Sequence, residues 1–154
     1  MKAEYINPFI SAFFNVLKQA AQTDGKRGQL TLRTSMLSSH DIAVLISIIG
    51  DLEGQVVYTM SEEVAKRLAS AMMMGFPVEE LNDLARSAIS EFANMVTGNA
   101  VMLLGSQGLK INISPPTLVK GKEMEITFEI PMLSIPISTP LGEMEIDVAL
   151  REKS

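Results

Sequence analysis

A glycine-bounded turn between two apolar runs is the feature that most constrains the fold. Residues 42–49 read IAVLISII and residues 55–60 read QVVYTM, and both runs are rich in β-branched side chains. The five residues between them, GDLEG, have glycine at each end, as short connections between paired strands often do. The sequence therefore predicts a β-hairpin in this part of the chain.

Three other segments have the apolar spacing of helices. In the first, Asn7 can cap the helix and Pro8 fills its first turn, and the pattern ends at residues 23–25. The second begins at Ser61, ahead of two glutamates, and ends in three methionines. Those methionines fit either irregular core space, which is favoured, or an adaptable binding surface. The third helix is predicted over 78–104.

The remaining strands are predicted from alternation of apolar and polar residues. Residues 29–37 alternate as a half-buried strand does, and 109–114 also read as a strand. The runs EMEITFEI (123–130) and EMEIDVAL (143–150) each predict a strand with one solvent-exposed face and one buried face. Residues 131–140 contain three prolines, so an edge or a connection is expected there.

Composition narrows the class of protein. The 154 residues are 47% hydrophobic, which predicts a single globular domain over 1–154. The net charge of −5 gives no basic patch for nucleic acid. There is no cysteine and only one histidine, which leaves no disulfide and no thiolate or imidazole cluster for a metal. No membrane-spanning run or leader is evident, so a cytoplasmic location is expected.

The predicted helix over 78–104 carries a narrow polar stripe. Ser87, Glu91, Asn94 and Gly98 follow one another at intervals of four, three and four, and Ser90 lies beside them. The opposite side is apolar and is predicted to face the core. Its members are Leu81, Ala85, Ala88, Ile89, Phe92, Val96 and Leu103.

Two interpretations of the stripe stand side by side. For an arbitrary helix, the ordinary interpretation of such a stripe is a polar face in contact with solvent. Against it, Asn is a poor helix former, Gly98 costs about 1 kcal/mol in a helix interior, and the flanking residues are short. Such a bare ridge could enter a narrow cleft of another protein. There Glu91 could pair with a lysine, while the amide of Asn94 could hold a water.

The chain resembles the CheC, CheX and FliY phosphatases of bacterial chemotaxis. The pattern S-x3-E-x2-N at Ser87, Glu91 and Asn94, with a proline about twenty residues later, is similar to the signature of that family. The hairpin IGDLEGQVVYTMS and the helix AKRLASAMMMG extend the resemblance over most of the chain. A single E-x-x-N pair on a short chain is most similar to CheX. Whether Pro115 or Pro116 corresponds to the family's proline stays open.

The resemblance implies a phosphatase that accelerates hydrolysis of the aspartyl phosphate of a CheY-like response regulator. Glu91 and Asn94 would be its catalytic residues, and Ser87, Ser90 and Gly98 would contact the partner. The chain would need no cofactor of its own, because the phosphorylated receiver domain brings Mg²⁺. The family also implies a homodimer.

A short internal similarity predicts the architecture. Residues 11–17, SAFFNVL, align with residues 90–96, SEFANMV, with Ala12 opposite Glu91. If this reflects a structural repeat, the fold is α+β, with two pseudo-repeated halves and long helices packed on one face of an antiparallel sheet. Only the second half would carry a complete pair.

Two other functions compete with the phosphatase. One is a non-catalytic interaction module that binds a response regulator or a flagellar switch component, and it would tolerate Asn94→Asp or Asn94→Ser. The other is a structural domain that only dimerises through a sheet edge.

Overall fold

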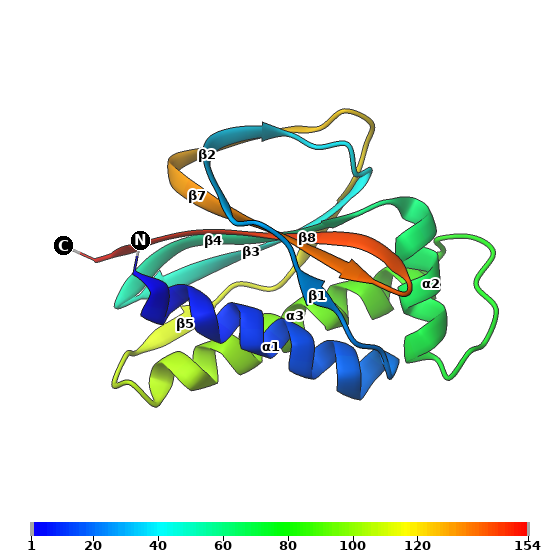
Figure 1. Ribbon diagram of the computed structural model, residues 1–154, viewed down its shortest axis with the longest axis horizontal. Helices are drawn as coiled ribbons and strands as arrows, with labels where there is room; N and C mark the ends of the chain where they lie inside the picture. Colours follow the sequence, from blue (N-terminus) through cyan, green and yellow to red (C-terminus); the bar gives the residue numbers. More distant parts are fainter. Residues whose placement is uncertain (1, 154) are drawn as a thin grey trace.

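Strands of one antiparallel sheet form the centre of the protein, and the long helices pack against one face of it (Figure 1). The computed structural model describes residues 2–153, except for the side chains of residues 36 and 37. In chain order the elements are α1 (Ala3–Ala21), β1 (Lys26–Arg27), β2 (Thr31–Leu37), β3 (Ile42–Gly50), β4 (Leu52–Met60), α2 (Glu62–Met72), α3 (Asp83–Gly105), β5 (Ile111–Ile113), β6 (Thr117–Lys120), β7 (Glu125–Thr139) and β8 (Gly142–Glu152).

The sheet has the pseudo-twofold topology that the internal similarity predicts. The strand order is β1-β7-β8-β4-β3-β5, with β2 also pairing with β7 and β6 also pairing with β3. Each half is thus a long helix followed by four strands. The hairpins β3–β4 and β7–β8 meet at the central β4–β8 pair, and the short strands of each half pair with the hairpin of the other. The α+β fold and its repeat are confirmed.

The register of the predicted helix alignment, however, is off by one residue. Ala12 is fully buried, whereas Glu91, which that alignment places opposite it, is exposed. The burial patterns of α1 and α3 coincide when Ser11 is set against Glu91, which places Phe14 against Asn94. The first helix therefore carries neither residue of the pair at the equivalent positions.

The central hairpin and the start of α2 are confirmed. Strands β3 and β4 pair from Ile42 opposite Met60 to Ile48 opposite Gly54. Residues 49–53 connect the two paired segments, while β3 pairs with β5 and β4 pairs with β8 on their outer sides. Ser61 caps α2, because its Oγ accepts a 3.1 Å hydrogen bond from the N–H of Val64.

The two long helices begin elsewhere than predicted. Helix α1 starts at Ala3, so Pro8 lies inside it and has no N–H to donate to the carbonyl of Glu4. The side chain of Gln107 donates to that carbonyl instead, at 3.3 Å. Helix α3 starts five residues later than expected, because Asn82 caps it: its Oδ1 accepts from the N–H of Ala85 at 2.9 Å.

The expectation of an edge or connection at residues 131–140 is wrong, since β7 runs through almost all of this segment. The carbonyl of Pro136 accepts a 2.8 Å hydrogen bond from the N–H of Gly28. Gly28 lies between β1 and β2, so the missing N–H of Pro136 faces an interruption of the ladder. Pro131 lies where the pairing of β2 with β7 shifts register.

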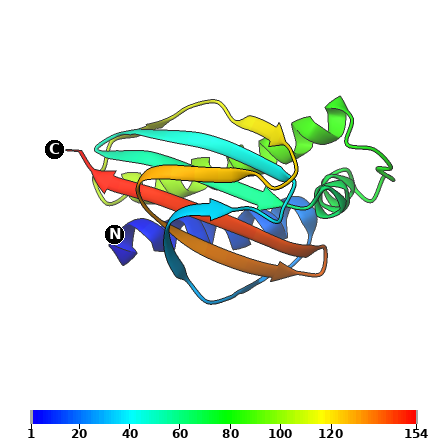
Figure 2. The same ribbon diagram turned by 90° about the horizontal axis from the view of Figure 1, so that it is seen from above.

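Apolar residues pack on both faces of the sheet. The main core fills the space between α1, α2, α3 and the sheet. A smaller cluster lies on the opposite face, where the first half of β7 crosses over the sheet and places Phe128 and Met132 against Ala43, Val57 and Ala149 (Figure 2). Residues 31–35 of β2 are exposed throughout, so the predicted half-buried strand is a wholly exposed one over these residues.

Candidate functional site

The polar stripe lies on the outward side of α3. Glu91 and Ser87 are exposed, while Asn94, Ser90 and Gly98 are half-buried. We call these five residues the α3 ridge. The structure brings all of them onto one helix face, as the spacing predicts, and their roles stay predictions at this point.

Buried side chains on the other side of α3 fix which way the ridge points. They include Ala85, Ile89, Phe92, Ala93, Val96, Ala100 and Leu104. Leu103, which the sequence analysis assigns to the core, is 41% exposed, and its neighbour Leu104 is buried in its place. The helix face is therefore rotated slightly from the predicted one near its C-terminus.

Polar and aromatic contacts beneath the ridge hold α3 to the sheet and to α1. The hydroxyl of Tyr58 in β4 lies 2.8 Å from Oγ1 of Thr97 in α3. The ring of Phe13 in α1 meets the ring of Phe92 edge-on at 5.3 Å and stacks on Tyr58 at 6.2 Å. Burial raises the pKa of Tyr58, which keeps its hydroxyl neutral and able to donate.

The two central residues of the ridge are free of internal partners. Among the described residues, no hydrogen bond or ion pair involves the side chain of Glu91 or Asn94. A Cβ added at Gly98 would meet nothing within 4 Å, so no packing within the described chain requires glycine there. A carboxylate and an amide are thus presented outward on a helix with little steric cover.

The candidate prolines lie beside this helix. Pro115 and Pro116 form the connection between β5 and β6, and β5 packs against α3. The hydroxyl of Ser114 accepts from the N–H of Ser47 at 2.8 Å and donates to the carbonyl of Pro115 at 3.1 Å. This ties the connection to β3, but both prolines share it, so the correspondence stays open.

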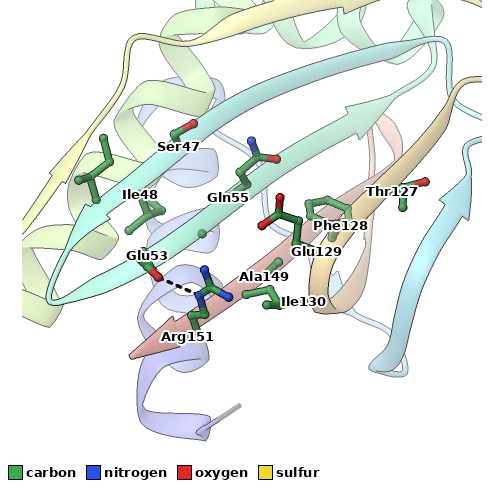
Figure 3. Close-up of a pocket in the computed structure, with 12 residues that line it drawn as sticks. Ser47, Ile48, Glu53, Gln55, Thr127, Phe128, Glu129, Ile130, Ala149 and Arg151 are labelled. Atoms are coloured by element: carbon green, nitrogen blue, oxygen red, sulfur yellow. Dashed lines mark hydrogen bonds and ion pairs between the residues drawn. The ribbon is translucent and has the colours of Figure 1, made fainter. Parts of the chain in front are cut away.

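A hollow lies on the face of the sheet opposite the helices. It has a volume of about 530 Å³ and opens between β3, β4 and β8 and the crossing part of β7 (Figure 3). Glu53 and Arg151 pair within it at 2.8 Å. It contains none of the ridge residues, so it is a separate feature from the predicted site.

A buried carboxyl lies on this face of the sheet. Asp147 has no exposed surface, and neither its oxygens nor the hydroxyl of Ser134 have a hydrogen-bond partner in the described structure. Burial, followed by the charge of Glu145, raises the pKa of Asp147 to about 8. The residues described contain no group of three His, Cys, Asp or Glu side chains that could hold a metal ion.

An apolar surface beside the ridge was not predicted from the sequence. Phe76, in the α2–α3 loop, is 70% exposed, and Leu84, in the first turn of α3, is 66% exposed. Both line a hollow of about 470 Å³. The sequence does carry a signal, since Phe76 lies between Gly75 and Pro77, two residues that place it in a turn instead of a core-facing element.

None of the helices that the structure describes is long and apolar enough to cross a membrane.

Comparison with known proteins gives a consistent result along the chain. The family profile of "Chemotaxis phosphatase CheX" matches residues 42–138. The CheY-P phosphatase CheX of Thermotoga maritima is 32% identical over 154 residues, which are 100% of this chain and 99% of that protein.

Solved structures extend the similarity to three dimensions. A CheC-like superfamily protein from Shewanella sp. PV-4 superposes with a TM-score of 0.89 at 28% identity, covering 98% of this chain and 99% of that one. The CheX–CheY–BeF3–Mg²⁺ complex from Borrelia burgdorferi contains a chain with a TM-score of 0.83 at 26% identity, covering 96% and 98%.

Proposed function

This chain belongs to the CheX family of chemotaxis phosphatases, and we propose that it accelerates hydrolysis of the aspartyl phosphate on a CheY-like receiver domain by placing the α3 ridge in the receiver's active site. The observation that carries this is the presentation of Glu91 and Asn94. Both project from a helix face bordered by small residues, without partners in the described chain. The relative crystallised with CheY, BeF3 and Mg²⁺ supports a phosphorylated receiver as the partner.

The reaction needs little chemistry from this chain. A water attacks phosphorus while the bond from phosphorus to the aspartate oxygen breaks, which yields inorganic phosphate and the free carboxylate. In a loose transition state, positioning of the water contributes most of what a helper protein can add. The amide of Asn94 can both accept from the water and donate to a neighbouring oxygen, so it can hold the water in line.

Glu91 has a different role, which is to orient the helix on the receiver. Its exposed carboxylate can pair with a lysine at the rim of the receiver's site, which aligns the helix and draws that lysine into a fixed position. Ser87, Ser90 and Gly98 then serve as the close-contact surface, because short side chains let the helix backbone approach. The Mg²⁺ belongs to the receiver, and the chain supplies no cofactor.

The decisive experiment is the lifetime of phosphate on a cognate receiver, with and without this protein. Wild type should shorten it, Asn94→Ala should abolish the effect while binding persists, and Glu91→Ala should weaken both binding and hydrolysis. Asn15→Ala, at an exposed asparagine on α1, is the matched control and should behave as wild type. If wild type binds the receiver but leaves the lifetime unchanged, the chain is an interaction module instead.

We also infer a homodimer that forms through the β2–β7 side of the sheet. Strand β8 is paired on both sides, but residues 125–127 and 132 of β7 pair only with β2 in the described structure, where the pairing skips residues 128–131. An extended segment paired on one side can accept another strand. Sedimentation at micromolar concentration should show a species of twice the 16.8 kDa chain mass, and a monomer alone would contradict the dimer. As a receiver phosphatase the protein is expected to work in the cytoplasm.

A further inference from the structure

An apolar hollow lies next to the α3 ridge at one end of the molecule. It is formed by the α2–α3 loop and the first turn of α3, which project together beyond the sheet (Figures 1 and 2). Its apolar lining comes from Met73, Phe76, Val78 and Leu84, and its volume is about 470 Å³. We call this the docking hollow.

The hollow exposes large apolar side chains that the fold does not use. Phe76 and Leu84 are mostly exposed, and Met74, next to the hollow, is 96% exposed. Burying an exposed Phe or Leu side chain in an interface stabilises the complex, because apolar surface is removed from water. Such grouped side chains beside a polar site are a typical mark of an interaction surface.

Hydrogen bonds fix the backbone of the loop that carries Met74 and Phe76. The N–H of Gly75 donates to the carbonyl of Ser70 at 2.8 Å, and the N–H of Phe76 donates to the carbonyl of Met73 at 3.2 Å. Lys66 donates to the carbonyl of Glu79 at 3.4 Å. A loop backbone already fixed in this way loses little conformational entropy when a partner covers it.

One residue of the hollow lies on the same side of α3 as the ridge. Leu84 precedes Glu91 by seven residues, which is two helical turns on the same side, or about 10 Å along the axis. A stable interface covers roughly 800 Å² on each partner, more than the short ridge side chains can supply. A partner engaged by Glu91 would therefore reach the hollow with the next part of its surface.

The charge around the hollow indicates what kind of surface fits. Residues 74–84 include Glu79, Glu80 and Asp83, and none of these carboxylates forms an ion pair among the described residues. Lys66, which reaches the carbonyl of Glu79, has its charge paired with Glu63 at 3.1 Å. Acidic groups around an apolar centre favour a partner with an apolar side chain flanked by basic ones.

From this we propose that the docking hollow binds an apolar side chain, flanked by basic residues, on the same phosphorylated receiver whose active site receives the α3 ridge, and that it determines which receiver is bound. The inference rests on the proposed function for the identity of the partner. Phe76 and Leu84 contribute to binding and take no part in hydrolysis.

Steady-state hydrolysis of the phosphorylated receiver tests whether the hollow contributes to binding and not to the chemical step. Phe76→Ala and Leu84→Ala should each raise KM about tenfold, with kcat within twofold of wild type. Ile49→Ala is the control, since Ile49 is 56% exposed at the far end of the sheet, and it should leave both constants unchanged. An unchanged KM in the two hollow variants, or an equal rise in the Ile49 control, would overturn the proposal.

A binding measurement separates this inference from the phosphatase assignment. The probe is the receiver carrying BeF3 and Mg²⁺, titrated against wild type, Asn94→Ala and the Phe76→Ala/Leu84→Ala double variant. Loss of binding in the double variant alone supports the hollow, even if wild type proves unable to hydrolyse the phosphate. Equal affinity of all three, a stronger effect from Met102→Ala at the other end of α3, or no binding by wild type would each refute it.

Discussion

The hydroxyl of Tyr58 donates a hydrogen bond to Oγ1 of Thr97, 2.8 Å away in the core beneath the α3 ridge. The direction follows from the other contact of Thr97, whose single hydroxyl proton goes to the carbonyl of Ala93, also at 2.8 Å. Thr97 lies one turn after Asn94. The strand that forms half of the central hairpin is therefore bonded to the helix directly below the predicted catalytic amide.

This arrangement predicts an asymmetry between two substitutions. Thr97→Val leaves the buried Tyr58 hydroxyl without an acceptor and should lower the free energy of unfolding by about 2–3 kcal/mol. Tyr58→Phe leaves Thr97 bonded to Ala93 and should cost only about 1 kcal/mol. Urea unfolding of both single variants and the double variant would measure this. Equal costs, or fully additive ones, would contradict the assigned donor.

Gly98 offers a prediction in which stability and activity move in opposite directions. Because a Cβ there meets nothing in the described chain, Gly98→Ala should raise the free energy of unfolding by about 0.5–1 kcal/mol. The same methyl group would hold the helix away from the receiver and should reduce phosphate hydrolysis several-fold. Thermal unfolding and the phosphate-lifetime assay, run on the same preparations, test both parts.

Gly105→Ala is the comparison for this effect. A Cβ added at Gly105 would likewise meet nothing within 4 Å, but this glycine lies at the end of α3, away from the ridge. The substitution should leave hydrolysis unchanged. If Gly98→Ala hydrolyses as fast as wild type, close approach of the helix backbone at Gly98 is not required.

The buried carboxyl of Asp147 predicts how stability depends on pH. Burial raises its pKa to about 8 in the folded protein, above the ordinary value of 3.8. The folded state therefore holds a proton that the unfolded chain releases, so stability falls as the pH rises from about 4 to about 8, by at most about 1.4 kcal/mol per pH unit. Above pH 8 the effect of Asp147 on the free energy of unfolding no longer changes with pH.

Asp147→Asn should remove this dependence. Relative to wild type, the variant should gain stability as the pH is raised from 5 to 9, because it never buries a charge. Urea unfolding at each pH gives the difference, with the exposed Asp24→Asn as a control. A difference between wild type and Asp147→Asn that stays constant with pH would show that Asp147 does not titrate in this range.

Local patterns predicted the parts of the fold that local chemistry determines. The hairpin, the Ser61 cap and the outward position of Glu91 follow from alternation, side-chain capping and helical spacing. The internal similarity predicted the two-halved topology, although the burial of Ala12 places its register one residue away. These features need no information about distant parts of the chain.

Features that depend on contacts with distant parts of the chain could not be predicted from local sequence patterns. Pro136 is compatible with β7 because the opposing edge is interrupted at Gly28. In α1, the carbonyl that Pro8 leaves free is bonded by Gln107, which lies far along the chain. The short strands β1 and β6 have too few residues to form a periodic pattern. At the site, the exposure of Phe76 likewise depends on what the rest of the fold leaves uncovered.

The last prediction distinguishes a phosphatase from a module that only binds. Asn94→Asp keeps the shape of the side chain but replaces the amide donor with a negative charge, three residues from Glu91 and facing an anionic phosphoryl group. If Asn94 positions water beside that group, hydrolysis should fall by about 100-fold or more, since positioning contributes several kcal/mol. A binding module with no water to hold would keep its affinity for the receiver. Asn15→Asp is the control, because it makes the same charge change on α1. This variant should shorten the phosphate lifetime as much as wild type does. If it loses activity to the same extent as Asn94→Asp, the effect comes from net charge and not from the ridge.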